Sequence, residues 1–423
     1  MNILLINTSD KLGGAAVACS RLRDALRKEG MEVNMLVAHK ETVDPTVYTV
    51  SSKWLNRFYF LWERLCVFYK NGFRRDTLFQ IDIANIGADI TTLDVFKQAD
   101  VIHLHWWNQG TLSLEGLLKI IRTKKPIVWT MHDMWPFTSI CHYTDTCTAY
   151  HQICCNCPIL FSRSGVSDLS YTIFKKKQRI YSEGNIGFVG CSSWLANQAR
   201  LSALIDAKMI FSIPNPIDIN RFCPADKNKV RKQLNLSLEK KYILCGAVNS
   251  KDPRKGLDYM LEVSKLLAMS AESDYHFLLV GKSSEEMKEH LALPATVLPF
   301  TTDQKQMSLY YQAADLFVIP SLQENLPNMI MEAMACGTPC VGFEVGGIPE
   351  MIQHQSTGYV ARLKDTKDLA EGIVYCLSDE DRLVSLSVAS RRWVEDNYAE
   401  TKVATRYLSL YKQLLRTNSN GAI

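Results

Sequence analysis

Short apolar runs alternate with stretches of helical periodicity along almost the whole of the 423-residue chain. Such alternation is typical of parallel sheets with helices on both faces, because parallel strands need a crossover between them. A chain of this length is expected to form two domains, and both sheets should be doubly wound α/β structures. The apolar runs predict strands at Ile3–Asn7, Val33–Ala38, Val101–His105, Ile127–Met131, Ile186–Cys191 and Ile210–Ile213 in one domain, and at Ile243–Val248, Phe277–Val280, Val297–Phe300, Leu316–Ile319 and Pro339–Phe343 in the other.

The segment 316–332 joins an apolar run, a polar turn and a helix. The run Leu316–Ile319 has the character of a strand inside a parallel sheet. Asn325 is predicted to cap the helix, and Pro327 to take its first position, where a missing N–H costs nothing. Free N–H groups at a helix start bind anions such as diphosphate. Glu332 would lie about 7–8 Å along the same helix, where it could accept hydrogen bonds from a ribose. The segment therefore predicts a sugar-nucleotide site.

Five further segments stand out as motifs. They are Gly13-Gly14, Thr130-Met131-His132-Asp133, Ile213-Pro214-Asn215-Pro216-Ile217-Asp218 with Phe222, Arg254-Lys255-Gly256 and Gly346-Gly347-Ile348-Pro349-Glu350. Together with Glu324 and Glu332, which have the spacing E-x7-E, they resemble the motifs of retaining glycosyltransferases of family 4, in the same order. The runs 103–108 (HLHWWN) and 134–137 (MWPF) resemble bacterial enzymes of this family that build capsular polysaccharide, exopolysaccharide and related surface polymers.

The resemblance covers nearly the whole chain and implies the GT-B fold, in which two Rossmann-like domains have a cleft between them. It implies that residues 1–212 bind the acceptor and that residues 213–396 bind a nucleoside diphosphate sugar. Residues 397–423 would form a last helix that crosses back to the first domain. The periodicity of that helix places one apolar face at Val403, Tyr407, Leu410, Tyr411, Leu414 and Leu415.

The resemblance also implies roles for residues of the donor site. Glu324 would contact the transferred sugar and Glu332 the ribose, while Lys255 would stabilise the charge that develops on the departing nucleotide. The donor-binding set is then Gly13, Gly14, Arg254, Lys255, Asn325, Leu326 and Glu332, and the catalytic set is His132, Lys255 and Glu324. The family often has an arginine near Gly246, where this chain has Ala247-Val248-Asn249-Ser250, so that phosphate contact is either missing or supplied by Arg254.

Each of these residues also has a purely structural interpretation. Glu324 could be a carboxylate favoured by the helix dipole, and Lys255 could belong to a solvated turn. His132 could be a hydrogen-bonded core histidine. The acceptor-binding set implied by position is His105, Trp106, Trp107 and Asp133, because aromatic faces suit sugar rings, but core packing explains the aromatic residues equally well.

Four cysteines have a spacing that suits a metal. Cys154 and Cys157 have the separation of a zinc-ligand pair, and Cys141 and Cys147 could complete a structural zinc site. Reduced thiols that only fill space are the alternative. No cofactor is expected for catalysis, since the D-x-D pattern at Asp379-Glu380-Asp381 is typical of a solvated helix face.

The segment Lys53–Arg75 is rich in aromatic residues and carries six basic residues and one acidic residue. Its apolar positions follow helical spacing. A basic, aromatic, amphipathic helix of this kind either lies on a membrane surface or packs against the first sheet.

Charge and motif content limit the partners. Residues 1–212 carry 24 Lys and Arg against 18 Asp and Glu, so this half suits a lipid-linked oligosaccharide acceptor with a pyrophosphate. No basic run lies among stacking aromatics on a nucleic-acid fold, so nucleic acid is not expected. The chain starts directly as a strand, so we expect a cytoplasmic protein, peripheral at most to the inner face of the membrane.

Two alternatives to a glycosyltransferase remain, a sugar-nucleotide epimerase and a non-catalytic scaffold of the polysaccharide machinery. A nicotinamide dehydrogenase is disfavoured, because the pattern G-x-G-x-x-G is missing.

Overall fold

A computed structural model of the chain describes residues 1–161, 168–249, 252–269, 274–282 and 284–420. The chain folds into two compact units. The first consists of Met1–Pro216 together with Val403–Ile423, and the second of Ile217–Lys402. The first unit is therefore completed by the end of the chain, which returns to it after the second unit has been formed.

The first unit is built on a parallel sheet of seven strands in the order β3-β2-β1-β4-β5-β6-β7. The strands are β1 (Asn2–Ser9), β2 (Glu32–His39), β3 (Val47–Thr49), β4 (Val101–Leu104), β5 (Ile127–Met131), β6 (Ile186–Gly190) and β7 (Ile210–Ser212). The helices are α1 (Gly14–Lys28), α2 (Lys53–Lys70), α3 (Asp94–Lys97), α4 (Leu114–Arg122), α5 (Leu169–Tyr181) and α6 (Ser193–Arg200). β1 lies between β2 and β4, so the strand order reverses there, and open sheets bind ligands at such a point.

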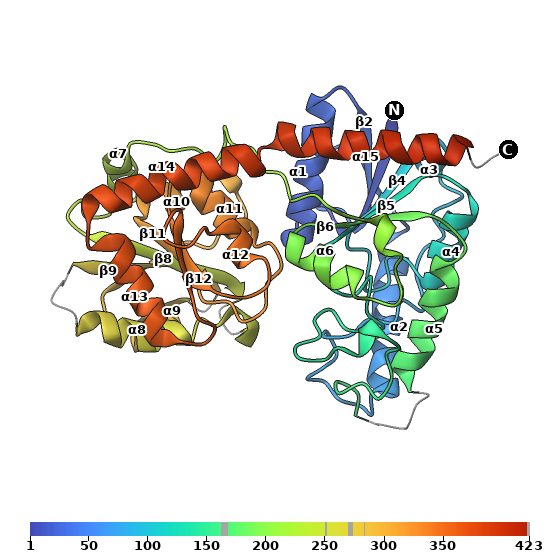
Figure 1. Cartoon of the computed structure of the whole chain (residues 1–423), viewed down its shortest axis with the longest axis horizontal. Helices are drawn as coiled ribbons and strands as arrows, with labels where there is room; N and C mark the ends of the chain where they lie inside the picture. Colours follow the sequence, from blue (N-terminus) through green and yellow to red (C-terminus); the bar gives the residue numbers. More distant parts are fainter. Residues whose placement is uncertain (162–167, 250–251, 270–273, 283, 421–423) are drawn as a thin grey trace. The chain divides into compact units, whose positions relative to one another are not determined.

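Alternate residues of β1 contribute to the two apolar cores on the faces of this sheet. Leu4 and Ile6 point into one core, and Ile3 and Leu5 into the other. The second core is covered by α15 (Glu400–Asn420), the red helix of Figure 1. The apolar face predicted for this helix is confirmed, because its residues 403, 407, 410, 411 and 414 are buried there and residue 415 packs against them.

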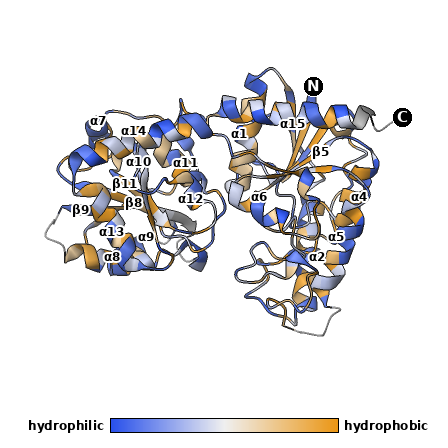
Figure 2. Ribbon diagram, viewed as in Figure 1, coloured by the Kyte–Doolittle hydropathy of each residue, from blue (hydrophilic) through white to orange (hydrophobic). Residues whose placement is uncertain are grey.

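The second unit has a parallel sheet of six strands in the order β10-β9-β8-β11-β12-β13. The strands are β8 (Lys241–Asn249), β9 (Tyr275–Lys282), β10 (Ala295–Leu298), β11 (Leu316–Ile319), β12 (Cys340–Phe343) and β13 (Gly358–Ala361). The helices are α7 (Lys227–Gln233), α8 (Tyr259–Ala268), α9 (Ser284–His290), α10 (Gln304–Ala313), α11 (Asn328–Ala335), α12 (Ile348–Met351), α13 (Thr366–Leu377) and α14 (Glu380–Asn397). Figure 2 shows the apolar strands of both sheets between helices of mixed polarity.

The predicted fold class is confirmed, and the differences lie at the sheet edges. The short edge strands β3 and β13 were not predicted, because neither Val47–Thr49 nor Gly358–Ala361 contains a continuous run of large aliphatic residues. Strand β10 starts at Ala295 instead of Val297, since its pairing with β9 begins at Phe277. None of the described helices combines the length and the apolar character needed to cross a bilayer.

Candidate active site

The candidate donor residues of the second unit follow two strands that pair with each other. The chain continues from β8 to Lys255 and from β11 to Glu324, and β8 and β11 are neighbours in the sheet. The strand order reverses between them. Residues at the carboxyl ends of such strands are where an open parallel sheet binds its ligand.

Lys255 and Glu324 are joined directly. The Lys255 ammonium donates a hydrogen bond to the Glu324 carboxylate, which also accepts one from the Ser321 hydroxyl at 3.3 Å. Lys255 ends a short 3-10 turn, Pro253–Lys255, which Asp252 caps by accepting from the amide of Arg254 at 3.1 Å. The carboxylate side chain is 12% exposed and that of the lysine 35%, so solvent reaches the lysine more than the carboxylate.

Two glycines permit the close backbone approach that holds this pair. Gly256 has φ +61°, and a Cβ there would lie 1.9 Å from the carbonyl oxygen of Pro320. Gly346 has φ +57°, and its Cβ would lie 1.7 Å from the carbonyl oxygen of Glu324. A side chain at either position would meet backbone in a conformation that L residues avoid. The glycines of both motifs therefore fix the position of Glu324.

The helix after Glu324 starts later than predicted. α11 begins at Asn328, and Pro327 occupies the cap position with an extended backbone (ψ 118°), so the predictions for Asn325 and Pro327 are wrong. Asn325 is buried before the helix, and its carbonyl accepts from the amide of Gly347 at 2.9 Å. Pro327 itself has no side-chain acceptor that could cap α11. The N-terminus of a helix favours an anion through its amides and its dipole.

Glu332 lies in α11 and points toward the neighbouring helix α10. Its carboxylate accepts a hydrogen bond from the hydroxyl of Tyr311 at 2.9 Å, and the residue is buried. Leu326 is buried as well. A carboxylate has several lone pairs and can accept hydrogen bonds from more than one donor at once.

Arg254 is occupied by its own turn. Its guanidinium binds both oxygens of Asp252, at 3.1 and 2.7 Å, and lowers the pKa of that carboxyl. Its side chain is half exposed, so a phosphate could still reach it. Ser250, part of the run in which the family often has an arginine, lies outside the described residues.

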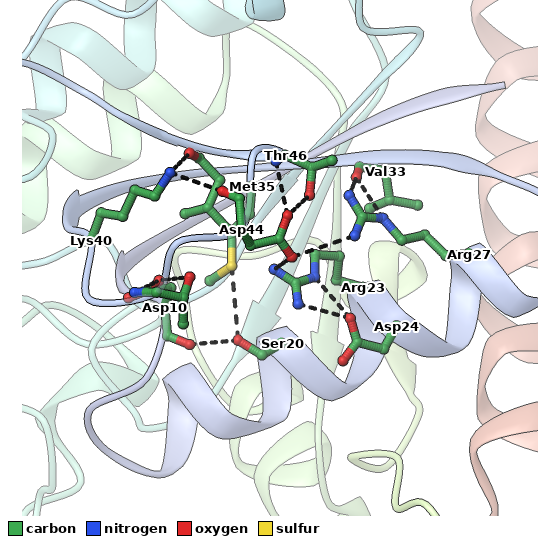
Figure 3. A network of polar contacts seen from close by, with 12 residues as sticks. Asp10, Ser20, Arg23, Asp24, Arg27, Val33, Met35, Lys40, Asp44 and Thr46 are labelled. Atoms are coloured by element: carbon green, nitrogen blue, oxygen red, sulfur yellow. Dashed lines mark hydrogen bonds and ion pairs between the residues drawn. The ribbon is translucent and has the colours of Figure 1, made fainter.

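In the first unit, Gly13 and Gly14 form the start of α1. Gly13 has φ +92° and no atom within 4 Å of a built Cβ, so glycine is required there by the backbone conformation alone. The same loop is tied to the segment after β2, because Asp10 accepts from the amides of Glu41 and Thr42 at 2.9 and 3.0 Å. Figure 3 shows this network and the ion pair of Asp44 with Arg23, at 3.1 Å, beside it. The loop before α1 is therefore held in place.

Three histidines are stacked where β4 and β5 end. The His105 Nδ1 lies 3.0 Å from the His132 Nε2, and His103 lies between the hydroxyls of Tyr411 and Thr130 at 2.6 and 2.8 Å. Burial lowers the pKa of His132 to about 4 and that of His103 to about 3. Both rings are therefore neutral at physiological pH. His132 can donate or accept a hydrogen bond but carries no charge for a phosphate.

Asp133 is bound to groups other than the adjacent His132. It accepts from the indole N–H of Trp106 at 2.8 Å, from the amide of Trp135 at 2.9 Å and from the ring of His142 at 2.7 Å. Burial alone would raise the pKa of Asp133, but His142 and these donors outweigh it and the pKa lies below its usual value. Sequence reasoning missed His142, which nothing in the spacing connects to Asp133.

Of the two tryptophans in the acceptor set, one is a core residue. Trp107 is fully buried, with the rings of Trp129 and Trp135 both at 5.1 Å. A ring without exposed surface offers no face to a sugar, so the structure favours core packing for Trp107. Trp106 is partly exposed, and its orientation is fixed by the bond to Asp133.

The four cysteines of the predicted zinc site line one small pocket, of about 20 Å³, together with Cys155. Burial raises the pKa of the Cys141 and Cys154 thiols to about 12, so both are protonated as they stand. Among the described residues, no three His, Cys, Asp or Glu side chains are grouped so that they could hold a metal ion. Zinc therefore stays a prediction for metal analysis.

Family models match both units of the chain. Residues 12–221 match the model described as Glycosyltransferase Family 4, and residues 239–379 match that described as Glycosyl transferases group 1. The chain belongs to this glycosyltransferase superfamily.

Curated relatives match this chain over part of their own length. N-acetyl-alpha-D-glucosaminyl L-malate synthase of Bacillus anthracis is 30% identical over 221 residues, 51% of this chain and 57% of the relative. The lipopolysaccharide core biosynthesis mannosyltransferase LpsB of Rhizobium meliloti is 27% identical over 235 residues, 52% of this chain and 66% of the relative. The chain thus spans between about half and two thirds of these proteins.

Solved structures match the chain from end to end. Sucrose-phosphate synthase from Thermosynechococcus elongatus superposes with a TM-score of 0.67 and 19% identity, covering 99% of this chain and 100% of that one. HepE from Anabaena, in complex with UDP, has a TM-score of 0.64 and 15% identity, covering 98% and 100%. These similarities show the GT-B fold.

Proposed function

We propose that this chain transfers a hexose from a nucleoside diphosphate sugar to a saccharide acceptor carried on a lipid, with retention of anomeric configuration, in the assembly of a surface polysaccharide. The observation that carries the proposal is the donor cluster of the second unit. Lys255 pairs with Glu324 at the strand ends, Glu324 shortly precedes the start of α11, and Glu332 lies in that helix. Together they provide a cation and amides for phosphate and carboxylates for sugar hydroxyls.

The diphosphate of the donor is negatively charged, and the Lys255 ammonium attracts it. The ammonium of Lys255 already contacts one carboxylate, and a phosphate placed at the start of α11 would share it. The negative charge that grows on the phosphate as the sugar departs is then stabilised by a cation and helix amides that need little reorganisation. HepE was crystallised with UDP, which supports a nucleoside diphosphate as the leaving group.

The chemical step is a same-face substitution. An acceptor hydroxyl oxygen forms a bond to the anomeric carbon, the bond from that carbon to the phosphate oxygen breaks, and the hydroxyl proton passes to the departing phosphate. Glu324 binds a sugar hydroxyl and orients the ring, because Lys255 and Ser321 hold its carboxylate. His132 enters as a neutral hydrogen-bonding group, in keeping with its lowered pKa. We propose that both units take part in the transfer.

The donor and the acceptor are proposed as classes. LpsB is a mannosyltransferase of lipopolysaccharide core biosynthesis, which supports a hexose and a lipid-bound saccharide. The test is a panel of nucleotide sugars incubated with the full chain, with and without a membrane lipid extract, followed by detection of released nucleotide and of labelled lipid. Acceptor-dependent release supports the proposal. Conversion of the sugar nucleotide without acceptor would favour an epimerase, and binding without turnover would favour a scaffold.

A further inference from the structure

Helix α2 of the first unit turns its apolar side toward solvent. Trp54 is 83% exposed and Tyr69 69% exposed. At about 100° per residue, the exposed apolar side chains occupy a sector of roughly 120° on the helix surface. We call this surface the α2 face. It consists of Trp54, Leu55, Phe58, Leu61, Trp62, Leu65 and Tyr69.

The opposite side of the helix is anchored by polar contacts inside the unit. The Asn56 amide donates to the carbonyl of Ala38 at 2.7 Å. Glu63 has no exposed surface and accepts from the amide of Ala84 at 2.7 Å. Because these groups would lose their partners if the helix rotated, the orientation of α2 is fixed. The exposure of the α2 face is therefore built into the fold.

Arg64 strengthens this anchoring. Its guanidinium donates to the carbonyl of Leu78 at 2.6 Å and to the carboxylate of Asp82 at 3.1 Å. The side chain is buried, as is its partner Asp82. The acidic residue and one arginine of α2 are thus buried. Aromatic residues such as Trp54 and Tyr69 are exposed instead.

The apolar surface continues past the end of the helix. Phe73 is exposed and its ring lies 5.8 Å from that of Tyr69. Its backbone has φ +63°, a conformation that bulky residues seldom adopt. A group of neighbouring exposed apolar side chains of this kind usually marks an interaction site.

The charges around the α2 face select the partner. Lys53, Arg57, Lys70 and Arg75 are exposed, whereas the one acidic residue between positions 53 and 75 is the buried Glu63. Two copies of this face would bring like charges together, which disfavours a symmetric dimer. Anionic phospholipid attracts the same cations, and Trp and Tyr side chains prefer the boundary between headgroups and acyl chains.

We propose that the α2 face docks on an anionic phospholipid surface, with the helix parallel to the membrane plane. The aromatic and leucine side chains enter the boundary region while the cations contact lipid phosphates. The lipid-bound acceptor belongs to the proposed function, but lipid docking depends on the α2 face alone.

Vesicle flotation of the full chain tests this surface. We expect binding to vesicles of phosphatidylcholine mixed with phosphatidylglycerol, and much weaker binding to phosphatidylcholine alone or at high salt. The combined variant Phe58→Gln, Leu61→Gln and Leu65→Gln should lower the partition coefficient by about tenfold or more. A second variant, Arg57→Gln with Lys70→Gln, should lose mainly the preference for anionic lipid.

A matched control replaces exposed apolar residues of the second unit, Met269→Gln, Val384→Gln and Val388→Gln. This control should bind vesicles as the unmodified chain does, and circular dichroism should show that all the variants fold. Absence of binding to anionic vesicles, or equal binding by the Phe58, Leu61 and Leu65 variant, would overturn the proposal. Sedimentation showing a dimer that the same variant abolishes, without vesicle binding, would assign the face to a second copy instead.

Nucleotide-sugar binding, measured in solution without lipid, separates this proposal from the proposed function. The α2 variants should retain it. A chain that binds vesicles but no nucleotide sugar would refute the proposed function and leave the lipid surface intact.

Discussion

The ammonium of Lys255 donates a hydrogen bond to the carboxylate of Glu324, although the two residues are 69 positions apart in the chain. The pair joins the loop after β8 to the loop after β11. It places a positive charge at the strand ends, where Glu324 shortly precedes the start of α11. In the proposed function this cation serves the diphosphate of the donor.

Removal of that cation should therefore affect binding more than stability. We expect Lys255→Ala to weaken nucleotide-sugar binding by about 1.5–3 kcal/mol, the range for hydrogen bonds to charged groups. The melting temperature should change little, because an ion pair with a partly exposed lysine contributes little. Calorimetric titration and thermal unfolding measure the two effects. Lys240→Ala is the matched control, since that lysine pairs with Asp274 at the surface, and a similar loss of affinity there would contradict the account.

Variants of Tyr311 and Glu332, which are hydrogen-bonded to each other, can distinguish a role of Glu332 in donor binding from a role in folding stability. Glu332→Ala should cost about 1–3 kcal/mol of donor binding, since the carboxylate is proposed to accept ribose hydroxyls. Tyr311→Phe removes one internal donor, at 2.9 Å, so it should cost about 1 kcal/mol of folding stability and little affinity. If both variants lose stability alike and neither loses affinity, Glu332 is a structural residue.

The loss of unfolding free energy on replacing a glycine should be larger where a Cβ would meet backbone atoms. Gly256→Ala forces a Cβ to within 1.9 Å of a backbone oxygen, in addition to its positive φ. We expect a loss of about 3 kcal/mol or more in unfolding free energy, with donor affinity reduced as well. Gly13→Ala meets no atom within 4 Å and should cost only the strain of its φ, about 1–2 kcal/mol. Chemical denaturation of both variants tests the order, which equal losses would contradict.

The buried histidines should make stability depend on pH. Burial lowers the pKa of His132 from 6.5 to about 4. Between these values the unfolded chain binds a proton that the folded chain does not, so stability falls as the pH falls through this window. His132→Asn should remove about 2 kcal/mol of the loss between about pH 7 and about pH 5. Denaturation curves at both pH values measure this difference. An unchanged loss in the variant would show that His132 is not buried as a neutral ring.

Much of the fold could be predicted because parallel strands leave strong local patterns. Leu316–Ile319 is four buried apolar residues in sequence and in structure alike, and the face of α15 follows from helical spacing. The start of α11 could not be predicted, because Pro327 is acceptable both at a cap and at the first helical position, and only its observed ψ of 118° decides.

Motifs in the sequence point to residues of the candidate site, whereas contacts between distant segments leave no signal in the sequence. Glu324, Lys255 and Glu332 stand in recognisable motifs. The bond of Asp133 to His142 and the pairing of His132 with His105 depend on how two loops meet, which has no periodicity to detect. Helix spacing likewise identified the apolar face of α2, but its outward direction is set by Asn56, Glu63 and Arg64, polar residues that the spacing alone would have placed outside.

Calorimetric titration of a panel of uridine and guanosine diphosphate sugars into the full chain tests the central claim most directly, when Glu332→Ala is titrated in parallel. The account predicts saturable binding of at least one compound, and an affinity for that compound about tenfold lower in the variant. Failure of every compound to bind, or equal affinity in the chain and the variant, would contradict a donor site in the second unit.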